Sequence, residues 1–248
     1  MSERSSLPRE NKQNAYHYVG DELDLFAGAS HWKEYVRYCL MPHIRGSVLE
    51  VGAGIGGTTT FLRPGDHRDW RCLEPDPKLA AILEQTLRQN WPRFEPDVLV
   101  GSIEALAGEQ NFDTILYIDV LEHIEDDRAE LARAAALLAS RGRLVVLSPA
   151  HNYLFSEFDR AIGHFRRYNR KLLRLISPQD LKLRELFYLD AVGMLLSLGN
   201  RALLRSPRPT FGQLAFWDRC IVPCSRLVDP ITLHRLGKTV IAVWEKAG

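Results

Sequence analysis

The sequence predicts an α/β fold, a Rossmann-like, seven-stranded, mostly parallel, doubly wound sheet with an insertion or lid at one edge. Short apolar segments alternate with helical ones, which is typical of a parallel sheet covered on both faces. Residues 112–120 show almost no polar alternation, as expected of a strand buried on both sides. The chain has 248 residues, 46% of them hydrophobic and 25% charged, enough for one domain with a full core.

Seven strands and several helices follow from the hydrophobic periodicity. The predicted strands are residues 48–51, 70–75, 96–103, 112–120, 142–150, 183–190 and 238–246. The predicted helices are residues 30–43, 77–89, 132–140 and 171–175, with another that starts near Thr58. Ser30 is the predicted cap of the first helix, and Gly142 the predicted end of the third.

The organisation predicted for residues 1–248 is a single domain. An N-terminal lid or flexible segment (1–29) precedes a ligand-binding core (30–186), a helical insertion (187–236) and a final strand (237–248). The insertion mixes apolar residues with arginines. It could close over an apolar ligand, touch a membrane surface, or add helices to the sheet edge.

Charge and cysteine usage predict an ordinary cytoplasmic protein. The formal net charge is +1, so no global field favours nucleic acid or an anionic membrane. Four scattered cysteines suit a reducing compartment. The N-terminus lacks the apolar core of a signal peptide, and no run of ~18 apolar residues predicts a transmembrane helix.

The glycine-rich run Glu50-Val51-Gly52-Ala53-Gly54-Ile55-Gly56-Gly57 follows the first strand. Glycines there let the backbone approach a ligand, and the next helix offers free N–H groups. The dinucleotide fingerprint is Gly-x-Gly-x-x-Gly, and the run here adds Gly56 and places Glu50 two residues before the first glycine. A carboxylate at Glu50 would repel a pyrophosphate but suits an ammonium group, which favours S-adenosylmethionine.

Further polar residues follow the next strands. Glu74 ends the second strand, where a carboxylate accepts hydrogen bonds from ribose hydroxyls. Ser102 and Ile103 follow the third and could hold an adenine ring, and Asp119 ends the fourth, beside the expected methionine moiety. Ligands bind at the carboxyl ends of strands in open α/β sheets, so these residues are expected to meet.

These motifs resemble those of the class I S-adenosylmethionine-dependent methyltransferases over residues 35–149. The resemblance implies S-adenosylmethionine as cofactor, with S-adenosylhomocysteine as product. It also implies cofactor contacts by Glu50, Gly52, Gly54, Glu74, Ser102, Ile103 and Asp119, although Ser102 stands where the family often has Asp. Residues 149–171, with the run Gly-His-Phe-Arg-Arg-Tyr, resemble one subgroup of that family.

Two histidines are candidate catalytic groups. If the methyl acceptor is a hydroxyl, its proton needs a base, and histidine is suited to that role near neutral pH. His164 lies in a polar loop and His151 follows the fifth strand. The alternative is that both only fasten the loop, with Arg166, Arg167 and Asp159 forming structural pairs.

Asp119-x-x-Glu122-His123 resembles a run that holds a divalent metal in ubiquinone-pathway O-methyltransferases and small-RNA 2′-O-methyltransferases. Such side chains are reasonable ligands for Mg²⁺ or Mn²⁺. Family members without metal carry a similar run. A glutamate at a helix start, such as Glu122, is also stabilised by the helix dipole alone. The prediction is therefore a site without metal.

The function predicted is O-methylation of a small-molecule, sugar-linked or lipid-linked metabolite. An amine acceptor, an RNA or protein acceptor, and a noncatalytic cofactor binder are the alternatives. No Asn/Asp-Pro-Pro-aromatic run follows the fourth strand, and no RNA-binding module accompanies the basic residues 166–174, so no nucleic acid partner is expected. The sequence predicts no oligomeric state.

Overall fold

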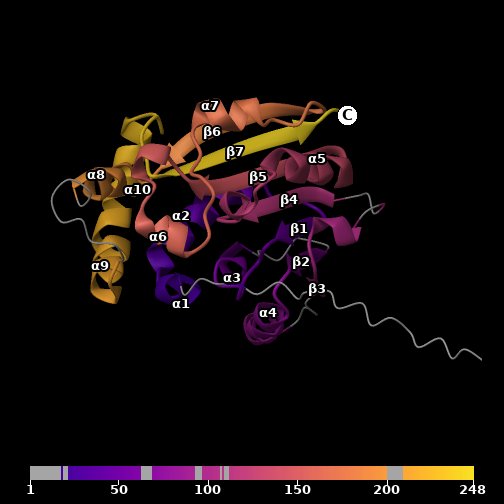
Figure 1. The fold of residues 1–248 in the computed structure, drawn as a ribbon, viewed down its shortest axis with the longest axis horizontal. Helices are drawn as coiled ribbons and strands as arrows, with labels where there is room; N and C mark the ends of the chain where they lie inside the picture. Colours follow the sequence, from indigo (N-terminus) through magenta and orange to yellow (C-terminus); the bar gives the residue numbers. More distant parts are fainter. Residues whose placement is uncertain are drawn as a thin grey trace, which may run out of the picture.

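The structure is a computed structural model that describes residues 18, 22–62, 69–92, 97–106, 108, 112–199 and 209–248. One seven-stranded sheet with the order β3-β2-β1-β4-β5-β7-β6 runs through it (Figure 1). Its strands are β1 (Val48–Val51), β2 (Trp70–Glu74), β3 (Asp97–Val100), β4 (Phe112–Ile118), β5 (Leu138–Pro149), β6 (Leu181–Leu189) and β7 (Thr239–Lys246). Strands β1 to β5 pair in parallel, whereas β7 pairs antiparallel with β5 and β6. The predicted fold class is confirmed.

Helices lie on both faces of this sheet (Figure 1). They are α1 (Glu22–Phe26), α2 (Ser30–Leu40), α3 (Thr59–Leu62), α4 (Pro77–Asn90), α5 (Asp127–Leu137), α6 (Glu157–Ala161), α7 (Arg170–Leu175), α8 (Ala191–Gly199), α9 (Phe211–Phe216) and α10 (Val222–Ile231). A π-helical turn, Trp217–Ile221, joins α9 to α10 without a break. In the described residues, no helix is both long enough and apolar enough to cross a bilayer.

Two hydrophobic cores form because each strand turns alternate side chains to opposite faces. One core joins Leu49, Ile115 and Leu144 with Leu131 of α5. The other joins Val48, Leu116 and Val145 with side chains of α2, α4 and α10. Both faces of the sheet are therefore covered. The edge formed by the carboxyl ends of the parallel strands remains accessible to a ligand.

The predicted end of the helix at residues 132–140, placed at Gly142, is wrong. Helix α5 ends at Leu137, and Gly142 lies inside β5, which begins at Leu138. The ladder with β4 shifts register there, and a Cβ on Gly142 would lie 2.8 Å from the carbonyl oxygen of Ala139. The glycine permits a close backbone approach within the sheet.

The predicted Ser30 cap is also wrong. Ser30 is the first residue of α2, and no side chain next to it caps the helix. The carboxylate of Asp218 instead accepts hydrogen bonds from the backbone N–H groups of His31 at 3.3 Å and Trp32 at 2.8 Å. The partner is 187 residues away in the chain, so local sequence patterns cannot reveal it.

Candidate functional site

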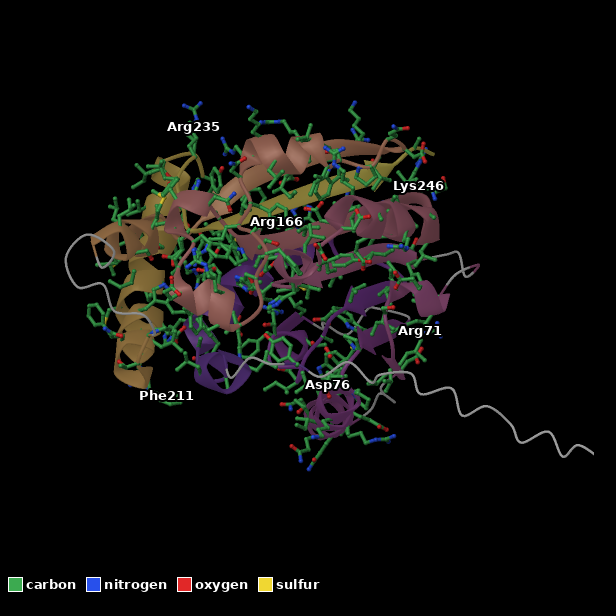
Figure 2. The ribbon with its side chains drawn as sticks, viewed as in Figure 1. Arg71, Asp76, Arg166, Phe211, Arg235 and Lys246 are labelled. Carbon is green, nitrogen blue, oxygen red and sulfur yellow. The ribbon has the colours of Figure 1, made fainter. Side chains whose placement is uncertain are left out.

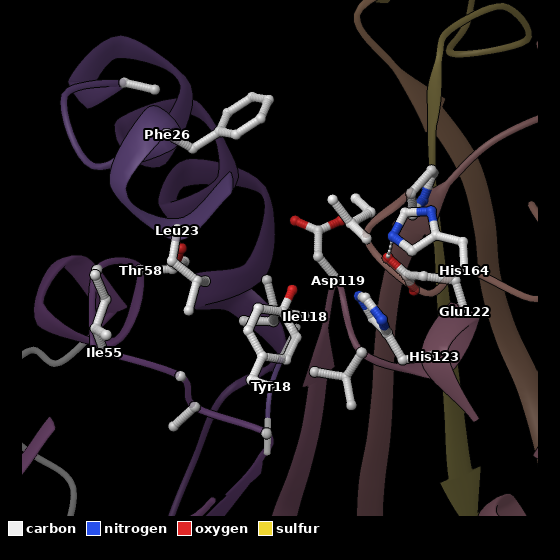
Figure 3. A pocket seen from close by; sticks show the side chains of 18 of the residues that line it. Tyr18, Leu23, Phe26, Ile55, Thr58, Ile118, Asp119, Glu122, His123 and His164 are labelled. Carbon is white, nitrogen blue, oxygen red and sulfur yellow. Dashed lines mark ion pairs between the residues drawn. The ribbon is translucent and has the colours of Figure 1, made fainter. Parts of the chain in front are cut away.

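A cavity of about 330 Å³ opens at the carboxyl ends of β1, β2 and β4. Side chains from α1 and the glycine-rich turn line one wall, and Asp119, Glu122, His123 and His164 line the opposite wall (Figure 3). Tyr18 lies between the two walls, with its ring 5.8 Å from that of His123. Tyr18 belongs to the segment 1–29 that is predicted to be an N-terminal lid or flexible segment, most of which lies outside the described residues.

The glycine-rich turn forms the cavity floor beside β1. Gly52 and Gly54 adopt φ values of +68° and +58°, which side chains disfavour. A Cβ on Gly52 would also lie 2.7 Å from a methyl carbon of Val120. Glycine is therefore required where this turn meets the segment after β4, and the turn's backbone remains open to a ligand.

Glu74 holds the turn from the end of β2. Its carboxylate accepts the Gly54 N–H at 2.8 Å and the Asp76 N–H at 2.9 Å. Burial raises the pKa of Glu74, although both amide hydrogen bonds oppose the rise. Because each carboxylate oxygen has a second lone pair, Glu74 can also accept hydrogen bonds from a ligand's hydroxyls.

Glu50 lines the cavity wall, but protein donors use its carboxylate. Thr59 Oγ1 donates to one oxygen at 2.9 Å, and Trp70 Nε1 donates to the other at 3.1 Å. Burial raises the pKa of Glu50 to about 7 despite these bonds. Its contact with a ligand's ammonium group stays a prediction, and its visible role is to fasten α3 and β2 to the turn.

Ser102 and Ile103 do not lie among the side chains that line the cavity. The Ser102 hydroxyl donates to Glu104. Ile103 is 2% exposed and belongs to the hydrophobic core under the sheet. Their predicted contact with an adenine ring remains untested.

Asp119 and Glu122 bring carboxyl groups to the wall after β4. Asp119 has a φ of +54° and donates its N–H to the Leu147 carbonyl at 2.9 Å. Glu122 is fully buried, and burial together with the Asp119 charge raises its pKa well above the ordinary value. One Glu122 oxygen accepts from the Ser148 hydroxyl, whereas Oε1 has no hydrogen-bond partner among the residues that the structure describes.

His164 forms a hydrogen-bonded pair with Asp159 at the cavity wall. Its Nδ1 lies 2.9 Å from Asp159 Oδ1, and its Nε2 lies 3.9 Å from the unpartnered Glu122 Oε1. With Nδ1–H donated to the carboxylate, Nε2 is left with its lone pair. His164 therefore has the arrangement of a general base oriented by an acid.

Asp159 is fixed by partners around it. The guanidinium of Arg167 donates to both of its oxygens, at 2.7 and 2.9 Å, and Ser156 adds a hydrogen bond. Although burial opposes it, the bonds from His164 and Arg167 hold the pKa of Asp159 well below the ordinary range. The structure thus confirms the suggested pairing of Arg167 with Asp159, and Asp159 stays charged.

His151 lies outside the cavity lining. Its ring stacks on Tyr153 and is tilted against Tyr188, with ring centroids 4.8 Å apart in both pairs. Its backbone N–H donates to the Tyr168 carbonyl. The structure brings only His164 of the two candidate bases to the cavity.

The far end of the cavity contains residues that were not among the predicted cofactor-binding or catalytic residues, although Trp217 belongs to the insertion (187–236) that could close over an apolar ligand. The ring systems of Phe26, Trp32 and Trp217 line it. The Lys238 ammonium lies 4.1 Å from the Trp217 ring centroid and 3.4 Å from Asp190 Oδ2. Burial lowers the pKa of Lys238, and the Asp190 charge counteracts this. This end is mainly aromatic, with a cation at its edge.

Three side chains at the wall could also hold a metal ion. Glu122, His123 and His164 each offer one ligand atom, all within 4.8 Å of one another. Burial, together with the neighbouring His164, lowers the pKa of His123 to about 4, so its ring is neutral and able to coordinate. Two imidazoles and one carboxylate fit a divalent ion, and the unpartnered Glu122 Oε1 agrees with such a fit.

Comparison with known proteins gives a match to a family model over part of the chain. Residues 49–144 match the model described as a methyltransferase domain. A ubiquinone biosynthesis O-methyltransferase of Rhodopseudomonas palustris (strain HaA2) is 26% identical over 106 residues, 43% of this chain and 41% of that protein. The match thus spans less than half the length of this curated relative.

Solved structures resemble the whole fold at low identity. A chain described as a methyltransferase, in a complex with the Trm112 activator of Haloferax volcanii, superposes with a TM-score of 0.60 at 16% identity, covering 93% of this chain and 100% of that one. The N-methyltransferase NodS of Bradyrhizobium japonicum, in complex with S-adenosylhomocysteine, gives 0.57 at 14%, covering 94% and 95%. These similarities show that the architecture is shared.

Proposed function

Because residues 49–144 match a methyltransferase-domain model, we propose that the protein is an S-adenosylmethionine-dependent methyltransferase that methylates a hydroxyl group of a small, largely apolar acceptor. The observation that carries the proposal is one cavity with two dissimilar ends. The glycine-rich turn and Glu74 form one end, and the Asp159–His164 pair with aromatic side chains forms the other.

The residues of the first end fit S-adenosylmethionine. Gly52 and Gly54 leave backbone exposed to the ligand, Glu74 accepts hydrogen bonds from the ribose hydroxyls, and Asp119 attracts the cationic methionine moiety. When bound, the cofactor supplies an activated methyl group on its sulfonium. Carboxyl groups at this end disfavour a pyrophosphate, so the site suits this cofactor better than a dinucleotide.

At the second end, His164 takes the acceptor's proton. Its Nε2 accepts the hydroxyl proton as the oxygen gains the methyl group, and Asp159 stabilises the resulting imidazolium. Phe26, Trp32 and Trp217 bind the apolar body of the acceptor and exclude water. Orientation of the two reactants in one cavity supplies much of the rate.

An amine acceptor is the second candidate. NodS, which shares the fold, is an N-methyltransferase, whereas the ubiquinone-pathway relatives are named as O-methyltransferases. An amine can arrive neutral and needs little help from a base. The Asp159–His164 pair favours a hydroxyl acceptor, because methyl transfer to a neutral amine does not require a general base.

The proposal places no metal in the site, and an alternative assigns Glu122, His123 and His164 to a divalent ion. Such an ion would lower the pKa of the acceptor hydroxyl and orient it. Removal of metal ions by a chelator distinguishes the metal-free mechanism from the metal-dependent one. Turnover that survives dialysis against EDTA supports His164 as base, and a loss reversed by Mg²⁺ or Mn²⁺ assigns these side chains to the metal.

The test measures transfer of a labelled methyl group from S-adenosylmethionine to a panel of phenols, sugar hydroxyls and amines. For a hydroxyl acceptor, we expect His164→Ala to lower kcat by roughly 10²–10⁴-fold with unchanged cofactor affinity. His151→Ala should change kcat little, because its ring stacks outside the cavity. Full turnover by His164→Ala, or methylation of amines only, would contradict the proposal.

A further inference from the structure

An exposed apolar stripe follows the continuous helical run from Phe211 to Ile231. Its inner side buries Trp217, Val222 and Ser225 against the body of the protein. Its outer side repeats apolar or thiol side chains every three or four residues: Phe216, Cys220, Cys224, Leu227 and Ile231, all exposed. Leu227 and Ile231 are 73% and 80% exposed, so the stripe has no cover in the described protein.

Neighbouring elements at the same end of the molecule also expose apolar side chains. Helix α8, which packs against α10, exposes Leu195, Leu196 and Leu198, and the turn after α10 exposes Leu233 and Leu236. Helices α8, α9 and α10 gather at one end of the molecule (Figure 1). Single exposed apolar residues are common, but such a concentration indicates a contact surface. We call these residues the apolar end.

The exposed charges of the apolar end have one sign. In the described part of residues 191–236, the exposed charged residues are Arg219, Arg226 and Arg235. Figure 2 shows Arg235 and Phe211 at this end of the molecule. The acids in the same part, Asp218 and Asp229, are at most 3% exposed. Asp218 accepts a hydrogen bond from the first turn of α2, and Asp229 accepts one from the Tyr35 hydroxyl.

We propose that the apolar end docks on the surface of an anionic lipid bilayer. Exposed leucine, isoleucine and phenylalanine enter the acyl boundary while arginines meet lipid phosphates, which is the chemistry of interfacial helices. A second copy of this chain fits less well. A two-fold contact places the same patch on both sides, and the arginines would then face one another.

The docking has a consequence for the cavity, which rests on the function proposed above. Trp217 lines the cavity from the inner side of the helical run whose outer side forms the stripe. Docking would therefore hold the acceptor end of the cavity close to the bilayer. An apolar acceptor dissolved in lipid could then reach the site without crossing water.

The experiment is co-sedimentation of the full chain with vesicles, which needs neither cofactor nor acceptor. We expect binding to equimolar phosphatidylglycerol and phosphatidylcholine, and little binding to phosphatidylcholine alone. The double variant Arg219→Gln with Arg226→Gln should weaken binding by at least tenfold, because each arginine near an anionic surface contributes about fivefold to the affinity. Leu227→Gln with Ile231→Gln should also weaken it, whereas the control Ile82→Gln on α4 should not.

Three results would overturn the proposal. These are no binding to either vesicle, equal binding to both, and binding that the paired substitutions leave intact. Light scattering of the same proteins adds a further criterion. A dimer that Leu227→Gln with Ile231→Gln dissociates would assign the apolar end to a second copy instead. Failure of methyl transfer would leave the vesicle result unchanged, so the two proposals fail independently.

Discussion

At the scale of single residues, Glu50 shows how a motif position can serve the fold. Its carboxyl group is buried, with Thr59 and Trp70 as donors, and burial raises its pKa to about 7 from an ordinary 4.5. The native protein therefore keeps this proton to a higher pH than the unfolded chain does. The group's contribution to stability is full below about pH 4.5 and is lost as the pH rises toward 7.

The substitution Glu50→Gln tests this linkage. The amide can still accept from Trp70 and bond to Thr59, but it does not titrate. We expect the loss of unfolding free energy between pH 5 and pH 8 to be smaller in Glu50→Gln than in the wild type, by up to about 3 kcal/mol. Urea unfolding at the two pH values measures it, and an identical pH dependence would contradict the assignment.

At the scale of secondary-structure elements, Asp218 joins the helical segment after β6 to the cavity wall. It occupies the place of a cap for α2, and α2 carries Trp32 and Lys33 at the cavity. The first N–H groups of a helix need acceptors, and a side chain distant in sequence provides them here. Loss of Asp218 should therefore loosen both elements together.

We expect Asp218→Ala to lower the unfolding free energy by about 1–2 kcal/mol, the usual cost of losing a helix cap. Asp218→Asn keeps one acceptor oxygen and should cost less, which makes it the matched control. Urea unfolding followed by circular dichroism measures both variants. If the two variants lose equal stability, the cap is not the source of the effect.

The elements near the cofactor end were predictable because their signals are local. Gly52, Gly54, Glu74 and Asp119 each lie at or shortly after the end of a strand, and parallel strands bring such positions to one edge. The helix boundaries that failed depend on contacts between residues that are distant in the sequence. Gly142 reads as a helix end in sequence, but it permits a backbone approach between β4 and β5.

At the scale of the whole molecule, the acceptor end of the cavity was less predictable. Lys238 and Trp217 come from separate segments that only the folded chain brings together. The Asp159–His164 pair had a weak local signal, since Ser156-Glu157-Phe158-Asp159 forms a capping box at the start of α6. That pattern locates a helix start but gives no direction for the His164 ring.

The two ends of the cavity also differ in how the chain builds them. Residues 49–144, which match the methyltransferase domain, supply the glycine-rich turn, Glu74 and Asp119. The acceptor end draws on side chains outside that range, including Trp32, His164 and Trp217. Under the proposed function, the matched domain would bind the cofactor, and the surrounding segments would select the acceptor.

Calorimetric titration with S-adenosylmethionine and S-adenosylhomocysteine, on the wild type and on Glu74→Ala, tests the central claim most directly. We expect binding of both ligands, and a loss of ~1–3 kcal/mol in the variant, because a buried ribose partner is removed. Ile82→Gln, an exposed position of α4 outside the cavity lining, should bind as the wild type does. Circular dichroism establishes that the variants are folded. A folded wild type that binds neither ligand would contradict the account, and nicotinamide dinucleotides would then be the ligands to titrate.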